Sequence, residues 1–276
     1  MEACHSDAIA RGERFSFGAN WTSFLSCLND YRIAEAENSL KAMLNVSDLS
    51  GKSFLDIGCG SGLFSLAARR LGAEVCSFDY DPQSVACTRE LKRRFFQDDK
   101  LWTIQEGSAL DERYINSIGQ FDVVYSWGVL HHTGNMMQGL RNAQKPVKQG
   151  GLLFIAIYND QGVASRFWTI VKKTYCSGSL GRYAISAIFI PAFALTYMVL
   201  GLVKYGNPTG EFTNYKRKRG MSLYHDWIDW LGGYPFEVAK PETIFLFYQA
   251  LGFRLLNLIT TNRLGCNQFV FERMRF

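Results

Sequence analysis

The chain has 276 residues, of which 47% are hydrophobic, 14% aromatic and only 20% charged. This length fits one large domain, or one domain with a substantial insertion, and is enough to bury a full core. The seven cysteines are scattered without a Cys-x-x-Cys pair, so neither a disulfide framework nor a zinc site is expected.

The charge and the first residues bear on partners and location. The net charge of +5 favours an anionic partner such as a lipid surface, nucleic acid or a phosphorylated substrate, without choosing among them. Residues 1–14 mix charges and lack the apolar segment of a secretory signal, so we expect a cytoplasmic protein. The high apolar content makes contact with a membrane a further hypothesis.

In chain order, two helices are predicted before the first strand, the second through the apolar positions Ile33, Ala36, Leu40 and Leu44. Residues 52–57 then read as a short buried strand, and residues 64–71 as a helix. Between them, three glycines at alternate positions allow a tight turn that a ligand can approach closely: Gly58, Gly60 and Gly62.

Two common nucleotide-binding turns do not match this segment. A dinucleotide fingerprint needs its third glycine at position 63, where Leu63 stands, and the Gly-Lys-Ser/Thr ending of a P-loop is absent. The next predicted strand, residues 74–79, ends in Asp79, about 20 residues beyond the glycines. A carboxylate at this place can accept both hydroxyls of a ribose, so the pair of features indicates a nucleoside-binding site.

The segment Asp56-Ile-Gly-Cys-Gly-Ser-Gly62, together with Asp79, resembles the motif of class I S-adenosylmethionine (SAM) dependent methyltransferases. The resemblance covers about residues 50–160 and implies SAM as cofactor and an α/β fold, with a Rossmann-like seven-stranded methyltransferase sheet. In this class Asp79 would bind the ribose, and Ser108 and Asp111 would lie on the adenine side, although a surface turn would have the same composition. Helices such as the two N-terminal ones cover the cofactor pocket in this class, or simply pack on the sheet edge. The implied cofactor-binding residues are Asp56, Gly58, Cys59, Gly60, Gly62, Asp79, Tyr80, Ser108, Ala109 and Trp127.

Strands and helices alternate beyond the motif: helix 82–96, strand 101–105, strand 121–127, helix 136–144, a turn at 148–151 and strand 152–158. His131 and His132 stand in the loop after the fourth strand, at the edge of a parallel sheet where ligands bind. This loop resembles that of small-molecule and quinone-type methyltransferases. A lone histidine is more often structural, yet here we expect at least one of the two in the site.

Residues 159–240 form a large, mostly helical insertion after the fifth strand, next to the acceptor side of the crevice. Within it, Ala184 to Val203 is a run of 20 residues without a charge, which meets the length of a membrane span. A single crossing conflicts with the final helix 242–251 and strands 253–260 and 267–272, which must return to the same sheet. The run is therefore a buried helix pair or cap helix, a re-entrant segment, or a helix in the membrane interface beside the basic cluster 216–219.

Residues 222–237 are dense in aromatic and acidic side chains. This stretch either walls a pocket or is an aromatic seam that fastens the insertion to the domain. In a pocket, His225 would be held by Asp226 or, if the stretch is helical, by Asp229. We expect Tyr224, His225 and Asp226 to be nearer the pocket than the tryptophans.

The sequence therefore predicts methyl transfer from SAM to an O, N or C nucleophile of a small or lipid-like acceptor. The candidate catalytic residues are His131, His132, His225, Asp226 and Tyr158. The predicted parts are a helical cover (1–50), a SAM-binding domain (51–158 and 241–276) and the insertion (159–240), with peripheral contact to an anionic membrane surface. Two alternatives stay open: an RNA or protein methyltransferase, and a non-catalytic SAM-binding or membrane scaffold protein.

Overall fold

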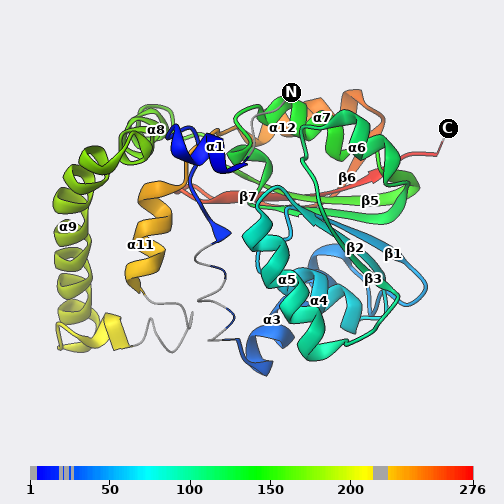
Figure 1. Ribbon diagram of the computed structural model, residues 1–276, viewed down its shortest axis with the longest axis horizontal. Helices are drawn as coiled ribbons and strands as arrows, with labels where there is room; N and C mark the ends of the chain where they lie inside the picture. Colours follow the sequence, from blue (N-terminus) through cyan, green and yellow to red (C-terminus); the bar gives the residue numbers. More distant parts are fainter. Residues whose placement is uncertain (1–4, 19–20, 22–24, 26–27, 214–222, 276) are drawn as a thin grey trace.

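The computed structural model describes residues 5–18, 21, 25, 28–213 and 223–275. Its centre is a seven-stranded sheet of order β3-β2-β1-β4-β5-β7-β6, in which β1 to β5 are parallel and β7 is antiparallel to both its neighbours (Figure 1). The strands are β1 (Ser53–Ile57), β2 (Glu74–Asp79), β3 (Trp102–Glu106), β4 (Phe121–Trp127), β5 (Val147–Tyr158), β6 (Phe253–Ile259) and β7 (Cys266–Arg273). The predicted Rossmann-like methyltransferase sheet is confirmed.

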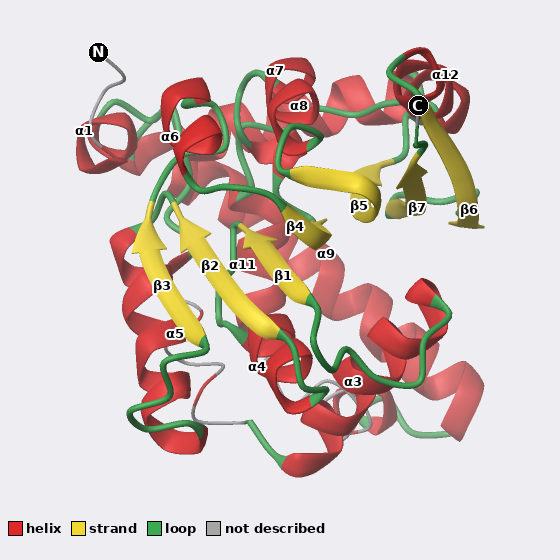
Figure 2. Ribbon diagram, turned by 90° about the vertical axis from the view of Figure 1, so that its right-hand side faces the viewer, coloured by secondary structure: helices red, strands yellow, loops and turns green. Residues whose placement is uncertain are grey.

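Helices cover both faces of the sheet (Figure 2). One face carries α3 (Asp30–Leu44), α4 (Leu63–Arg70) and α5 (Pro82–Phe95), and the other carries α6 (Glu112–Ser117), α7 (Met136–Ala143) and α12 (Pro241–Ala250). Each face has its own apolar cluster, as expected for parallel strands that are buried on both sides. Side chains of Asn29, Asp81, Asp111 and Asn135 accept backbone N–H groups at the starts of α3, α5, α6 and α7, which explains where these helices begin.

Strand β5 begins earlier than predicted. The turn expected at residues 148–151 is wrong, because these residues belong to β5 and lie beside β4. Gly150 adopts φ +74°, and a Cβ on Gly151 would lie 3.0 Å from the carbonyl oxygen of Asp122. Glycines that read as a turn therefore mark an irregular strand start, opposite the register shift between Phe121 and Val123 of β4.

The insertion consists, in its described part, of α8 (Val163–Cys176), α9 (Ser179–Tyr205) and α11 (Leu223–Gly232). A third apolar cluster joins them, built on Val171, Tyr175 and Leu231. Figure 1 shows α9 at the periphery of the molecule, beside α11 and away from the sheet. The predicted basic cluster at residues 216–219 lies outside the described residues.

The apolar run is one long helix, and it is not buried. Helix α9 has 27 residues with Pro191 inside it, and Gly201 is its one buried residue. Only 6% of its most apolar window is covered by protein, so the expectations of a buried helix pair and a buried cap helix are wrong. By length and composition alone, α9 is the one described helix that could cross a membrane.

Candidate active site

The glycine turn connects β1 to α4 at the carboxyl edge of the sheet. Gly58, Gly60 and Gly62 have φ values of +75°, +54° and +80°, which only glycine adopts readily. The backbone N–H groups of Gly58 and Cys59 both donate to the carbonyl oxygen of Phe78 in β2. A Cβ on Gly58 would lie 2.3 Å from Val129, so the turn packs directly against the loop that follows β4.

Asp79 lies at the end of β2 and binds the glycine turn. Its Oδ2 accepts the N–H of Gly60 and its Oδ1 accepts the N–H of Asp81, both at 2.9 Å. Burial raises the pKa of Asp79 to about 6. Each carboxylate oxygen offers further lone pairs, so Asp79 keeps acceptor capacity for ligand hydroxyls.

Asp56 lies beneath the turn rather than at its mouth. Only 2% of its surface is exposed, and the hydroxyl of Ser65 in α4 donates to its Oδ2 at 2.5 Å. Burial raises the pKa of Asp56 to about 7. Cys59 is also buried, and its Sγ accepts the hydroxyl of Thr88 at 3.2 Å. Both residues thus support the turn from behind in the structure.

The other predicted cofactor residues fall into two groups. Ser108 and Ala109 lie beside Asp79, because the N–H of Gly107 donates to the Asp79 carbonyl oxygen at 3.0 Å. Tyr80 faces the Arg14 guanidinium, 5.0 Å from its ring centre. Trp127, in contrast, donates to Gln268 of β7 at 3.2 Å, so its indole extends to the side of β4 opposite the glycine turn.

An N-terminal strap, residues 14–18 and Trp21, crosses this edge of the sheet. The N–H of Gly18 donates to Asp81 at 2.9 Å, and a Cβ on Gly60 would lie 3.2 Å from the ring of Trp21. Arg14 donates to the carbonyl oxygen of Thr133 at 3.1 Å. The strap thus contacts both the glycine turn and the loop after β4, whereas α3 packs against α4.

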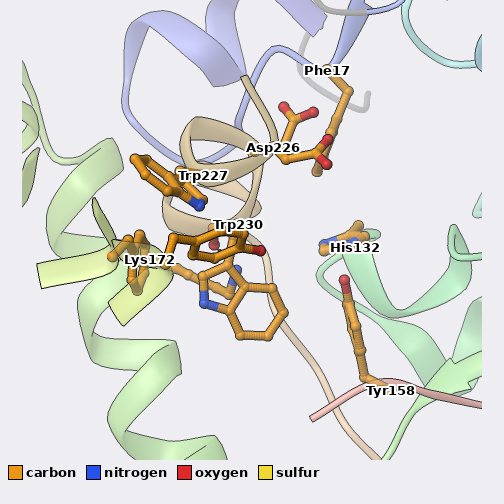
Figure 3. Close-up of a pocket in the computed structure, with 10 residues that line it drawn as sticks. Phe17, His132, Tyr158, Lys172, Asp226, Trp227 and Trp230 are labelled. Atoms are coloured by element: carbon orange, nitrogen blue, oxygen red, sulfur yellow. The ribbon is translucent and has the colours of Figure 1, made fainter. Parts of the chain in front are cut away.

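A cavity of about 410 Å³ lies between this edge and the insertion (Figure 3). His132 and Tyr158 come from the sheet edge, Phe17 from the strap, and the rest of the lining from the insertion. The insertion contributes Lys172, Phe193, Tyr197, Asp226, Trp227, Asp229 and Trp230. Its walls are mainly aromatic, with one amine, one imidazole and two carboxylates among the described lining residues.

The two adjacent histidines occupy different places. His132 lines the cavity, and its Nδ1 is 2.6 Å from the carbonyl oxygen of Pro235. A carbonyl only accepts, so Nδ1 carries the proton and the Nε2 lone pair is free to act as a base. Burial lowers the pKa of His132 to about 3, which keeps the ring neutral. His131 is fully buried behind it, where its Nδ1 accepts the N–H of Tyr158 at 3.3 Å.

The described part of residues 222–237 both lines the cavity and packs against the other helices of the insertion. Trp227 and Trp230 line the cavity and also pack against Phe193 of α9 and Trp168 of α8. Tyr224 is 52% exposed and does not line the cavity, so the expectation that it lies nearer the pocket than the tryptophans is wrong. His225 belongs to α11, but its side chain lies outside the described part.

Sequence reasoning missed Lys172 of α8. Its side chain is 1% exposed, and its ammonium donates to the carbonyl oxygen of Trp230 while lying 4.2 Å from the Trp230 ring centre. Burial lowers the pKa of Lys172 to about 7, against the opposite influence of Cys176 and Asp229. A signal existed: Lys172 falls on the helical stripe that also holds Ser165 and the buried Tyr175 and Cys176.

Comparisons with known proteins agree with this geometry. Residues 55–153 match a family model described as a methyltransferase domain. A ubiquinone biosynthesis O-methyltransferase of Pseudomonas paraeruginosa is 32% identical over 129 residues, which are 44% of this chain and 51% of that protein. One of Escherichia coli O6:H1 is 29% identical over 170 residues, which are 60% of this chain and 68% of that protein. The chain thus spans about half the length of the first of these curated relatives.

Solved structures share the fold at low identity. Magnesium protoporphyrin IX methyltransferase (ChlM) of Synechocystis PCC 6803 with bound SAH superposes with a TM-score of 0.52 and 14% identity, over 87% of this chain and 83% of that one. An O-methyltransferase family protein of Burkholderia thailandensis gives a TM-score of 0.54 and 14% identity, over 97% of this chain and 67% of that one.

The sheet order, the glycine turn and Asp79 define a Rossmann-like methyltransferase fold. With the family match, they show that the chain contains a methyltransferase domain of the class I, SAM-dependent kind.

Proposed function

We propose that the protein transfers the methyl group of SAM to a hydroxyl oxygen of a small, apolar acceptor. The observation that supports this most is the placement of His132. It lies in the loop after β4, which packs on the glycine turn through Val129, and its side chain lines the cavity. The cofactor cradle and a candidate base therefore share one edge of the sheet.

The chemistry asks little of the protein. A sulfonium methyl group is already electrophilic, so the rate comes chiefly from holding the nucleophile in line with it. His132 removes the hydroxyl proton through Nε2, while Pro235 fixes the orientation of its ring. Asp79 and the glycine turn bind the nucleoside, and the strap excludes water above them.

The cavity favours a flat, apolar acceptor. Phe17, Tyr158, Trp227 and Trp230 present aromatic surfaces around a volume of about 410 Å³, and such side chains contribute most to binding through apolar area. The two relatives by sequence are named for ubiquinone biosynthesis, and the ChlM neighbour for a porphyrin. The O-methyltransferase names support methylation at oxygen, and the porphyrin name supports a ring-containing acceptor, without identifying it.

The outer faces of α8 and α9 support an acceptor that resides in a membrane. Val163, Phe167 and Ile170 of α8 are exposed, as are Leu195 and Val203 of α9. Between Asp160 and Glu211 the chain has no acidic residue but five basic ones. Because β7 returns to the sheet beside β5, we propose that α9 lies in the membrane interface rather than crossing it.

Calorimetric titration with S-adenosylhomocysteine (SAH) tests the cofactor assignment. We expect the parent protein to bind, and Asp79→Ala to weaken binding by about 2 to 4 kcal/mol, since hydrogen bonds to a charged acceptor contribute roughly 1.5 to 3 kcal/mol each. Asp98→Ala, an exposed carboxylate outside the site, is the matched control. Unchanged affinity of a folded Asp79→Ala protein would remove Asp79 from the site.

A further inference from the structure

A neutral imidazole, His132, and an ammonium group, Lys172, lie close together at the cavity wall, next to Gly233. A Cβ placed on Gly233 would lie 3.0 Å from the carbonyl oxygen of Asp229, 3.4 Å from Cε1 of His132 and 3.5 Å from Nζ of Lys172. His132 comes from the loop after β4 and Lys172 from the insertion, so the fold brings them together from distant parts of the chain (Figure 3). Both groups are therefore close enough to contact the same end of a bound ligand.

The ammonium group of Lys172 is buried, which is an unfavourable environment for a cation. A buried ammonium loses its hydration, and here it is compensated by one backbone carbonyl and by the faces of two aromatic rings, 4.2 Å from Trp230 and 4.9 Å from Phe236. An ammonium has three N–H donors, and its one hydrogen bond to a described residue goes to the Trp230 carbonyl oxygen. It therefore has donors left for a ligand in the cavity that it lines.

Because His132 is a weak base, it needs a cation such as Lys172 beside the hydroxyl that it deprotonates. A neutral histidine this poorly basic removes a proton from an ordinary hydroxyl only at a large cost. A cation beside the same oxygen lowers that cost, since an opposite charge within about 4 to 6 Å depresses the pKa of an acidic group by roughly 1 to 3 units. The aromatic walls in turn suit a ring that bears the hydroxyl.

We propose that Lys172 is a catalytic residue whose ammonium pairs with the acceptor oxygen as an oxyanion, and that the acceptor is a phenol or an enol. This inference rests on the proposed methyl transfer and names its substrate class. His132 takes the hydroxyl proton at Nε2, and the oxyanion attacks the methyl carbon. The new O–C bond forms as the C–S bond breaks, its electron pair remains on sulfur as SAH, and the imidazolium later releases its proton to solvent.

The ligand 4-nitrophenol tests the pairing without SAM or turnover, because its anion absorbs visible light and its neutral form does not. The parent protein is expected to bind it as the anion and to lower its apparent pKa by about 1 unit or more. Lys172→Met, which keeps the length of the side chain without charge, should abolish this shift. Lys173→Met, an exposed lysine of the same helix, should behave as the parent.

A second variant keeps both side chains. Gly233→Ala places a methyl group at the point of convergence and should reduce anion binding at least about tenfold, while SAH affinity stays unchanged. Failure to bind 4-nitrophenol, or an equal pKa shift in the parent and in Lys172→Met, would overturn the proposal. Because SAH titration is measured separately, this failure is distinct from failure of the methyltransferase assignment.

Discussion

Replacing Lys172 by methionine should stabilise the fold at mildly acidic pH. Lowering the pKa of a buried lysine from 10.5 to about 7 corresponds to a penalty of roughly 5 kcal/mol on its charged form, at about 1.4 kcal/mol for each pKa unit. This penalty is a net value, in which the charges of Cys176 and Asp229 already favour the ammonium. Exchanging buried charges for apolar side chains commonly stabilises by about 1 to 4 kcal/mol, and we expect a gain in this range at pH 6.

The sign of the pH dependence follows from proton binding. Between pH 7 and 10.5 the unfolded chain keeps the Lys172 proton while the folded protein has lost it, so the parent gains stability as pH rises through this window. Lys172→Met lacks this contribution, so its advantage should shrink toward high pH. Denaturant unfolding of both proteins from pH 6 to 10 measures the difference in their free energies of unfolding. Other ionisable groups near the site are present in both proteins, so their contributions largely cancel; they are His132, Asp226, Asp229 and Cys176.

Two results would refute this reasoning. One is a Lys172→Met protein that is less stable than the parent at pH 6 by more than about 1 kcal/mol, which would mean that the ammonium is well solvated or paired. The other is a stability difference that does not change with pH.

Three further predictions concern cofactor binding, catalysis and the membrane. SAH affinity, measured by calorimetry, should decline as pH falls below about 6, because protonation of Asp79 removes acceptor capacity. The affinity of Asp79→Asn should not change with pH, and a decline in that variant too would contradict the role of Asp79. His132→Gln should lower turnover by about 10² to 10⁴ and leave SAH affinity within a few-fold; turnover near that of the parent would exclude His132 as the base. Replacing Leu195, Val199 and Val203 together by serine should reduce co-sedimentation with anionic liposomes at least about tenfold. Leu246→Ser is the control, and a parent protein that stays in the supernatant would refute membrane association.

Local patterns predicted the sheet and the cofactor side of the site. The strand that ends at Asp79 and the glycine turn are encoded within short segments, so they could be placed without tertiary information. The same holds for Pro82, at which α5 begins as expected.

The acceptor side depends on contacts between distant segments, and sequence patterns reach it poorly. Which of His131 and His132 faces the cavity is decided by the short helical turn at Leu130–His132 and by Pro235, about 100 residues away. Lys172 reads as a solvated charge until Trp230 and Phe236 are packed around it. The exposure of α9 depends on where the insertion docks, which its composition does not reveal.

Transfer of radiolabel from methyl-labelled SAM tests the central claim most directly. The parent protein is incubated with phenolic quinone precursors, with a total lipid extract and with RNA, beside the Asp79→Ala and Lys172→Met proteins. Label should enter an apolar, hydroxylated compound with the parent only, and the methylated product should be an ether that resists mild base, unlike a methyl ester. Label in RNA instead, or none in any fraction from a parent that binds SAH, would contradict methyl transfer to a small apolar hydroxyl acceptor.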